Sequence, residues 1–179
     1  MLIIITGRPG SGKSTLARQV SDTVRCPLVS RDQLKEGYIR TARLPHNALP
    51  ENTNRNVSGA FFQVLASLAG AGISAVAEAA FQHTVWEAGL AQLEEKAGIV
   101  ILLCKVSPDL ALQRFNNRLL ADPEREKFHG DQDVRFDEGL KKFIIEYKPP
   151  GLPYPTLEVD TTNGYTPGMN AIMDFIGIL

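Results

Sequence analysis

Apolar residues fall into two kinds of segment along this chain, and the two kinds alternate from one end to the other. The first kind is a short run rich in apolar and β-branched residues, and these runs cover residues 2–6, 27–29, 73–77, 99–106 and 156–160. Residues 2–6 show no polar alternation, which is typical of a strand buried on both faces of a parallel sheet. The pattern therefore predicts five strands, with residues 99–106 as the most apolar one and as a central strand of the sheet.

Segments with helical periodicity separate the apolar runs. We expect helices over residues 13–23, 31 to about 38, 56–71 and 84–96, from residue 107 onward, over 133–147, and from residue 166 onward. Ser30 or Asp32 can cap the helix that begins near residue 31, Thr84 the helix 84–96, and Ser107 the helix that begins there. The polar residues 41–56 predict a surface loop, and the charged residues 121–132 a mobile segment. Strands that alternate with helices predict an α/β fold with a parallel sheet covered on both faces.

Size and composition fit one soluble domain that spans residues 1–179. The formal net charge is −1, so the overall charge does not favour a nucleic-acid partner or an acidic membrane. No apolar run is long enough to cross a bilayer or to act as a signal sequence, so we expect a cytoplasmic protein. The two cysteines and three histidines show no metal-binding spacing. The sequence does not indicate an oligomeric state.

A glycine-rich motif lies between the first strand and the first helix, and it fits the phosphate-loop pattern G-x-x-x-x-G-K-[ST] in full. Its residues are Gly7, Arg8, Pro9, Gly10, Ser11, Gly12, Lys13 and Ser14. Glycines let the backbone turn its N–H groups toward phosphate oxygens, and the helix that follows adds the positive end of its dipole. We expect Lys13 to reach the terminal phosphates of ATP and the Ser14 hydroxyl to bind Mg²⁺.

Three further sets of residues are candidates for chemistry beyond nucleotide binding. Asp32 follows the second strand, where its carboxylate can accept the proton of an attacking hydroxyl, hold a Mg²⁺-bound water or merely cap a helix. Glu78 ends the third strand, where it can hold the metal indirectly or lie on a solvated rim. Arg114 and Arg118 are four residues apart on one helix face, where they can stabilise a transferred phosphate or form an ordinary basic surface.

The sequence resembles P-loop kinases of the polynucleotide-kinase-like and zeta-toxin-like type, an AAA-type family. The resemblance is carried by G-x-P-G-S-G-K-S-T at residues 7–15, by the pair Arg31-Asp32 and by the two arginines at 114 and 118. It implies that Thr15 and Arg114 also bind ATP and that Asp32 is the base toward the acceptor hydroxyl. It further implies that Lys35 contacts the substrate and that Arg118 stabilises the transferred phosphate.

The resemblance also implies a three-layer P-loop nucleoside triphosphate hydrolase fold, with strand order 2-3-1-4-5 and a short lid at about residues 114–132. Two positions depart from the pattern of the polynucleotide kinases. Glu78 is followed by Ala79 where that family has aspartate and threonine, and Lys35 stands where it has arginine. A lysine lacks the two-pronged guanidinium that grips a phosphate, so these departures weaken the case for a nucleic-acid substrate.

The sequence leaves the acceptor open. A kinase with this loop can act on a small molecule, a nucleoside or a nucleic-acid 5′ end, and chloramphenicol phosphotransferase and gluconate kinase share the fold. We expect residues 41–56, 81–86 and 133–147 to line the acceptor pocket. The alternative is a nucleotide-dependent ATPase or switch without an acceptor. A GTPase is not indicated, because the chain has no N-K-x-D motif.

Overall fold

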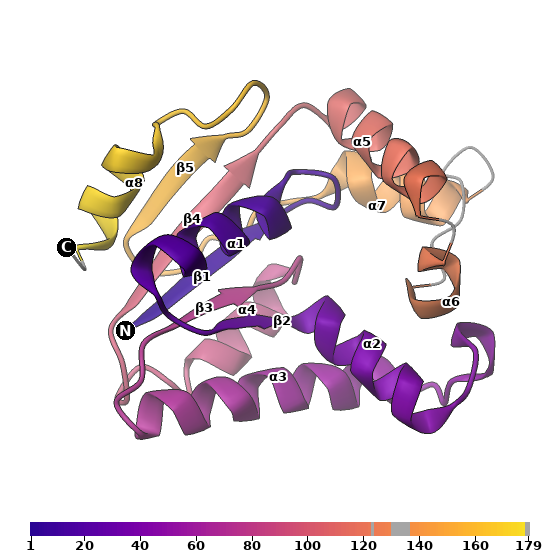
Figure 1. Cartoon of the computed structure of the whole chain (residues 1–179), viewed down its shortest axis with the longest axis horizontal. Coiled ribbons are helices and arrows are strands. Elements are labelled where there is room, and N and C mark those ends of the chain that lie inside the picture. The colour runs from indigo at the N-terminus through magenta and orange to yellow at the C-terminus, as the bar shows by residue number, and fades with distance from the viewer. Residues whose placement is uncertain (123, 130–136, 178–179) are drawn as a thin grey trace.

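A single five-stranded sheet forms the centre of the protein. The computed structural model describes residues 1–122, 124–129 and 137–177. The strands are β1 (Leu2–Gly7), β2 (Leu28–Ser30), β3 (Ala75–Glu78), β4 (Ile99–Lys105) and β5 (Thr156–Asp160). They pair in the order β2-β3-β1-β4-β5, and every pairing is parallel. The predicted α/β fold and strand order are therefore confirmed (Figure 1).

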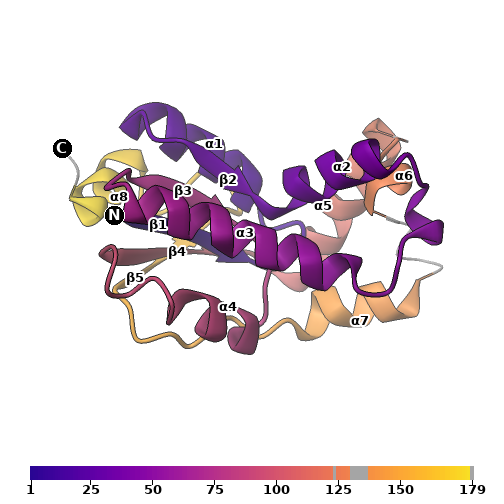
Figure 2. The same ribbon diagram turned by 90° about the horizontal axis from the view of Figure 1, so that it is seen from below.

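Helices cover both faces of the sheet (Figure 2). They are α1 (Lys13–Val24), α2 (Arg31–Ala42), α3 (Thr53–Gly70), α4 (His83–Leu90), α5 (Pro108–Ala121), α6 (Arg125–His129), α7 (Glu138–Glu146) and α8 (Met169–Ile176), with a 3-10 turn at His46–Ala48. Leu2 and Ile4 of β1 pack in one core with α3 and α4, whereas Ile3 and Ile5 pack in the other with α1 and α8. Alternate side chains of one buried strand thus serve two cores, which explains its unbroken apolar run.

Several helix boundaries differ from the sequence prediction. Helix α2 continues to Ala42, where Arg43 adopts a left-handed conformation, and α3 begins at Thr53 inside the predicted loop. Helix α4 starts after Gln82, so Thr84 is not its cap. It ends at Leu90 rather than near residue 96, because tight turns place Leu93 in the core at 1% exposure.

The charged segment at residues 121–132 contains a short helix, α6, which the sequence did not predict. Part of the expected lid, namely residues 123 and 130–132, lies outside the described residues, as do residues 133–136 of the expected helix 133–147. Ser107 caps α5 as predicted, since its hydroxyl accepts a hydrogen bond from the Leu110 N–H at 3.3 Å. Within the described ranges, no helix has the length and apolar character needed to span a membrane.

Candidate active site

The phosphate loop leaves β1 and enters α1 at the carboxyl edge of the sheet. Gly10 and Gly12 both have φ values of 80°, a left-handed conformation that favours glycine. Gly10 also lies against the first turn of α5, because a Cβ atom at this position would stand 2.2 Å from the Ala111 carbonyl oxygen. Helix α1 starts at Lys13, so its free N–H groups face the loop. This geometry fits the binding of a phosphate chain.

Two contacts from distant parts of the chain hold the loop. The Thr161 hydroxyl, at the end of β5, donates a 2.7 Å hydrogen bond to the Ser11 carbonyl oxygen. The Arg8 guanidinium points away from the loop and donates a 3.0 Å hydrogen bond to the Ile144 carbonyl oxygen in α7. Contacts from Thr161 and α7 thus hold the loop in place, and the buried Ser11 hydroxyl inside it has no hydrogen-bond partner among the described residues.

Glu78 lies beneath the loop rather than on a solvated rim. It is 2% exposed, and its carboxylate accepts hydrogen bonds from Ser14 Oγ at 3.3 Å and from Ser30 Oγ at 2.8 Å. The ammonium of Lys13 lies 3.6 Å from Glu78 Oε1. Strand register explains this meeting, because Ser30 of β2 pairs directly with Glu78 of β3. Glu78 can therefore position Ser14 for a metal ion.

A divalent ion at Ser14 would have few other protein ligands. Among the residues described, no group of three or more aspartate, glutamate, histidine or cysteine side chains could hold a metal. The arrangement fits Mg²⁺, which keeps several waters and takes nucleotide phosphate oxygens as ligands.

A cavity of about 450 Å³ lies beside the loop on the β5 side. It is lined by Gly10, Gly12, Thr15, Gln19, Arg114, Arg118, Thr161, Gly164 and Tyr165. Arg114 donates to the carbonyl oxygens of Thr161 at 2.8 Å and Thr162 at 3.1 Å, so it is not part of a solvated basic surface. We call this space the donor cavity, because Gly10 and Gly12, the left-handed glycines of the phosphate loop, line it.

Sequence reasoning missed the contribution of the loop after β5 to the donor cavity. Thr161, Gly164 and Tyr165 line it although they are about 150 residues from the phosphate loop. The available signal was their position just after a parallel strand, since ligands in such sheets bind beyond the carboxyl ends of strands.

A larger cavity of about 720 Å³ lies on the other side of the loop, and we call it the acceptor cavity. Lys13, Asp32, Lys35 and Arg118 all line it. Further lining residues are Asn54, Phe81, Gln82, Val85, Leu140 and Phe143, from the three segments expected to form the pocket. The structure adds residues that were not assigned to the pocket, namely Arg125 and His129 of α6.

Asp32 presents a charged carboxylate to the acceptor cavity. Ser30 occupies the capping position of α2, so Asp32 is not the helix cap, and its side chain is 46% exposed. Partial burial favours the neutral acid, but the nearby charges of Lys13, His129, Arg31 and Arg125 outweigh it and lower the pKa of Asp32 below its ordinary value. The carboxylate is therefore ionised near neutral pH and available as a proton acceptor.

The short helix α6 packs on α2 beside this cavity. His129 Nε2 lies 2.8 Å from Glu36 Oε1, and the Arg40 guanidinium lies 4.8 Å from the centre of the Phe128 ring. Lys35 is 5% exposed, with its ammonium 2.9 Å from His46 Nε2. Helix α6 therefore lies beside the acceptor cavity, with Arg125 and His129 in the lining.

Arg118 is the residue that connects the two cavities, because it lines both of them. Its guanidinium lies 5.3 Å from the centre of the Phe115 ring one turn earlier in α5. A cation between a donor space and an acceptor space suits charge that develops on a transferred phosphoryl group.

Comparison with known proteins agrees with this geometry. A family model described as an AAA domain matches residues 2–138. No curated protein matches the chain. A candidate kinase from Chloroflexus aurantiacus J-10-fl has a similar structure, with 24% identity, a TM-score of 0.82, and coverage of 98% of this chain and 96% of that one.

Two further solved structures share the fold at lower identity. A gluconokinase from Sinorhizobium meliloti 1021 has 16% identity and a TM-score of 0.63, over 98% of this chain and 90% of that one. A chain of the Pnkp1/Rnl/Hen1 RNA repair complex has 17% identity and a TM-score of 0.60, over 82% of this chain and 44% of that one. The chain therefore belongs to the AAA domain family and has the fold of the P-loop kinases, as its sequence motifs indicated.

Proposed function

We propose that this protein is an ATP-dependent kinase that transfers the γ-phosphoryl group to a hydroxyl of a small molecule. The observation that carries the proposal is the position of Asp32. Its ionised carboxylate and the phosphate-loop lysine, Lys13, line one cavity, and Arg118 lines both this cavity and the donor cavity. A proton acceptor, a phosphate-binding loop and a bridging cation are the components that phosphoryl transfer to a hydroxyl requires.

The chain's own residues have distinct roles in this reaction. Asp32 accepts the proton of the acceptor hydroxyl as the hydroxyl oxygen forms a bond to the γ-phosphorus. The bond between the γ-phosphorus and the oxygen that links it to the β-phosphate breaks, which releases ADP. Lys13 and Arg118 stabilise the negative charge on the transferred group. Ser14, held by Glu78, would bind Mg²⁺, which neutralises charge on the β- and γ-phosphates.

The acceptor cavity supports a small molecule over a nucleic-acid end. Its volume of about 720 Å³ is within the range of small-molecule sites. The net charge of −1 provides no general attraction for a polyanion. A neighbour of the same fold is named a gluconokinase, although another belongs to an RNA repair complex.

The proposal is tested by incubating the protein with γ-labelled ATP and a panel of sugars, sugar acids, nucleosides, antibiotics and nucleic-acid 5′ ends. We expect label in a small acceptor, and Asp32→Asn should lower transfer by about 10²-fold while ATP affinity is retained. Asp22→Asn, which changes an exposed acid on α1, is the matched control. If no acceptor stimulates ATP turnover and Asp32→Asn does not change it, the result would favour an ATPase or switch instead.

A further inference from the structure

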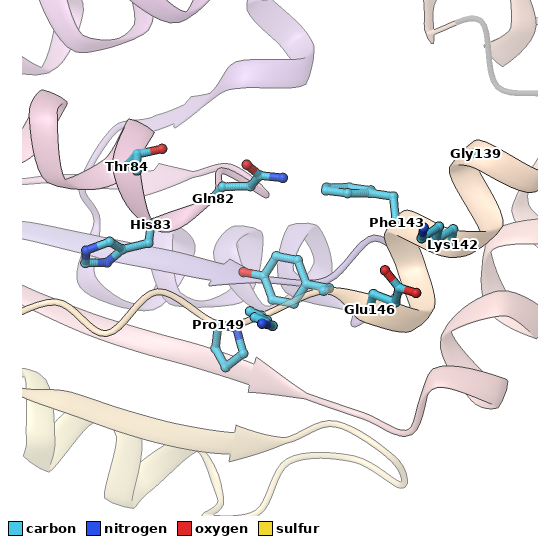
Figure 3. Close-up of a pocket in the computed structure, with 10 residues that line it drawn as sticks. Gln82, His83, Thr84, Gly139, Lys142, Phe143, Glu146 and Pro149 are labelled. Atoms are coloured by element: carbon cyan, nitrogen blue, oxygen red, sulfur yellow. The ribbon is translucent and has the colours of Figure 1, made fainter.

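A third cavity, of about 520 Å³, adjoins the acceptor cavity, and we call it the distal cavity (Figure 3). It lies between the start of α4 and the segment formed by α7 and the residues after it. Its lining residues are Gln82, His83, Thr84, Gly139, Lys142, Phe143, Glu146, Tyr147, Lys148 and Pro149. Gln82 and Phe143 line the acceptor cavity as well, and Figure 3 shows their side chains pointing toward each other. The two cavities therefore meet at this pair.

The distal cavity has more cationic than anionic groups in its lining. Lys142 and Lys148 contribute two ammonium groups, and among the described residues Glu146 alone adds an acid to the lining. The first turn of α4 adds backbone N–H groups that the Gln82 side chain does not cap. These groups and the helix dipole favour a negative charge at the same place as the lysines.

Two buried polar atoms of the lining lack hydrogen-bond partners among the described residues. Tyr147 is 8% exposed, and its Oη has no partner of acceptable geometry, although the Thr6 hydroxyl lies near it. His83 Nδ1 is buried without a partner, while Nε2 of the same ring lies 3.5 Å from Glu87 Oε1. Buried polar groups are rarely left unpaired, so these atoms indicate a ligand or bound water that would complete them.

We propose that the distal cavity is the second half of the acceptor site and binds an anionic group of the acceptor, either a carboxylate or a phosphate ester. This inference rests on the proposed kinase function, because the acceptor hydroxyl must lie at Asp32. The acceptor then extends past Gln82 and Phe143, with its anion among Lys142, Lys148 and the start of α4. ATP does not need this space, since no residue of the phosphate loop lines the distal cavity, whereas Gly10, Gly12 and Thr15 line the donor cavity.

A binding experiment tests the site without relying on catalysis. The full chain is saturated with ADP and Mg²⁺, so that the phosphate loop is filled, and is titrated calorimetrically with benzoate and with phenyl phosphate. Benzamide and phenol are the neutral counterparts. We expect one or both anions to bind more tightly than their counterparts. The double variant Lys142→Gln/Lys148→Gln should weaken anion binding about 3–10-fold, as expected for the loss of two exposed charges.

Lys141→Gln is the matched control, because Lys141 neighbours Lys142 on α7, pairs with Glu138 and does not line the cavity. The binding of benzoate and phenyl phosphate should be unchanged in this variant. A preference for benzoate indicates a carboxylate acceptor, and a preference for phenyl phosphate a phosphate ester. The inference is overturned if both anions bind no better than their neutral counterparts, or if the double variant binds them as the unmodified chain does.

Kinetics separates this inference from the proposed function. With any acceptor that the panel reveals, the double variant should raise the KM for that acceptor and leave kcat and the KM for ATP unchanged. If transfer requires Asp32 but the double variant has the same KM for the acceptor, the distal site is refuted and the kinase function stands. Lysine-dependent anion binding without transfer to any acceptor would refute the kinase function instead.

Discussion

Replacement of Gly10 by alanine tests the close contact between the phosphate loop and helix α5. At φ 80° an alanine pays about 1–2 kcal/mol for a left-handed conformation. Its Cβ would also stand 2.2 Å from the Ala111 carbonyl oxygen, a backbone atom that cannot rotate away. Forced displacement of packed groups costs about 1–3 kcal/mol, so the total destabilisation should be about 2–5 kcal/mol.

Gly72→Ala provides the matched control, because Gly72 has a φ of 73° but nothing within 4 Å of its added Cβ. It should cost only the conformational part, about 1–2 kcal/mol. Since 1 kcal/mol shifts Tm by about 2–4 °C in proteins of this size, Gly10→Ala should melt about 2–12 °C below the control. It should also weaken ATP binding, measured by calorimetry. Equal melting of the two variants would refute the proposed contact between the loop and α5.

Three other substitutions test separate parts of the site. Arg31→Gln removes one of the charges that lower the pKa of Asp32, so this pKa should rise. The acid limb of the kcat/KM profile, where activity is lost as Asp32 becomes protonated, should then move to higher pH. An acid limb at the same pH would argue against Asp32 as the base. Glu78→Gln should raise the Mg²⁺ concentration for half-maximal activity by about 10–100-fold, and an unchanged Mg²⁺ titration would exclude a role near the metal. Thr161→Val leaves the buried Ser11 carbonyl oxygen without its 2.7 Å hydrogen-bond donor. The free energy of unfolding in urea should fall by about 1–3 kcal/mol, and the KM for ATP should rise. Unchanged stability would contradict the support of the loop by Thr161.

The parts of the site that the sequence predicted are those with local signals. The glycines and the lysine of the phosphate loop have a fixed spacing within eight residues, and the buried strands have a recognisable composition. Asp32 and Glu78 were found because each lies at the end of a predicted strand. The role of Asp32 was ambiguous because a helix cap and a catalytic base can occupy the same position after a strand, and that of Glu78 because a strand end can be buried or solvated. The structure removes the capping role by placing Ser30 at the cap position of α2.

Features that depend on tertiary packing were beyond reach of the sequence. The early end of α4 follows from the burial of Leu93 in the core, which no helical periodicity reveals. The support of the phosphate loop by Thr161 joins residues 150 positions apart. The distal cavity likewise arises because α7 lies opposite the start of α4, and neither segment has a motif that indicates this.

Helix α2 both lines the acceptor cavity and forms the surface on which α6 packs. It carries Asp32 at its start and Lys35 one turn later, and on the same helix Glu36 contacts His129 of α6. A substitution that reshapes α2 therefore also changes the surface on which α6 packs. In a chimera between related chains, α2 and α6 should be exchanged together, because a new α2 beside the original α6 would lose the contact between Glu36 and His129.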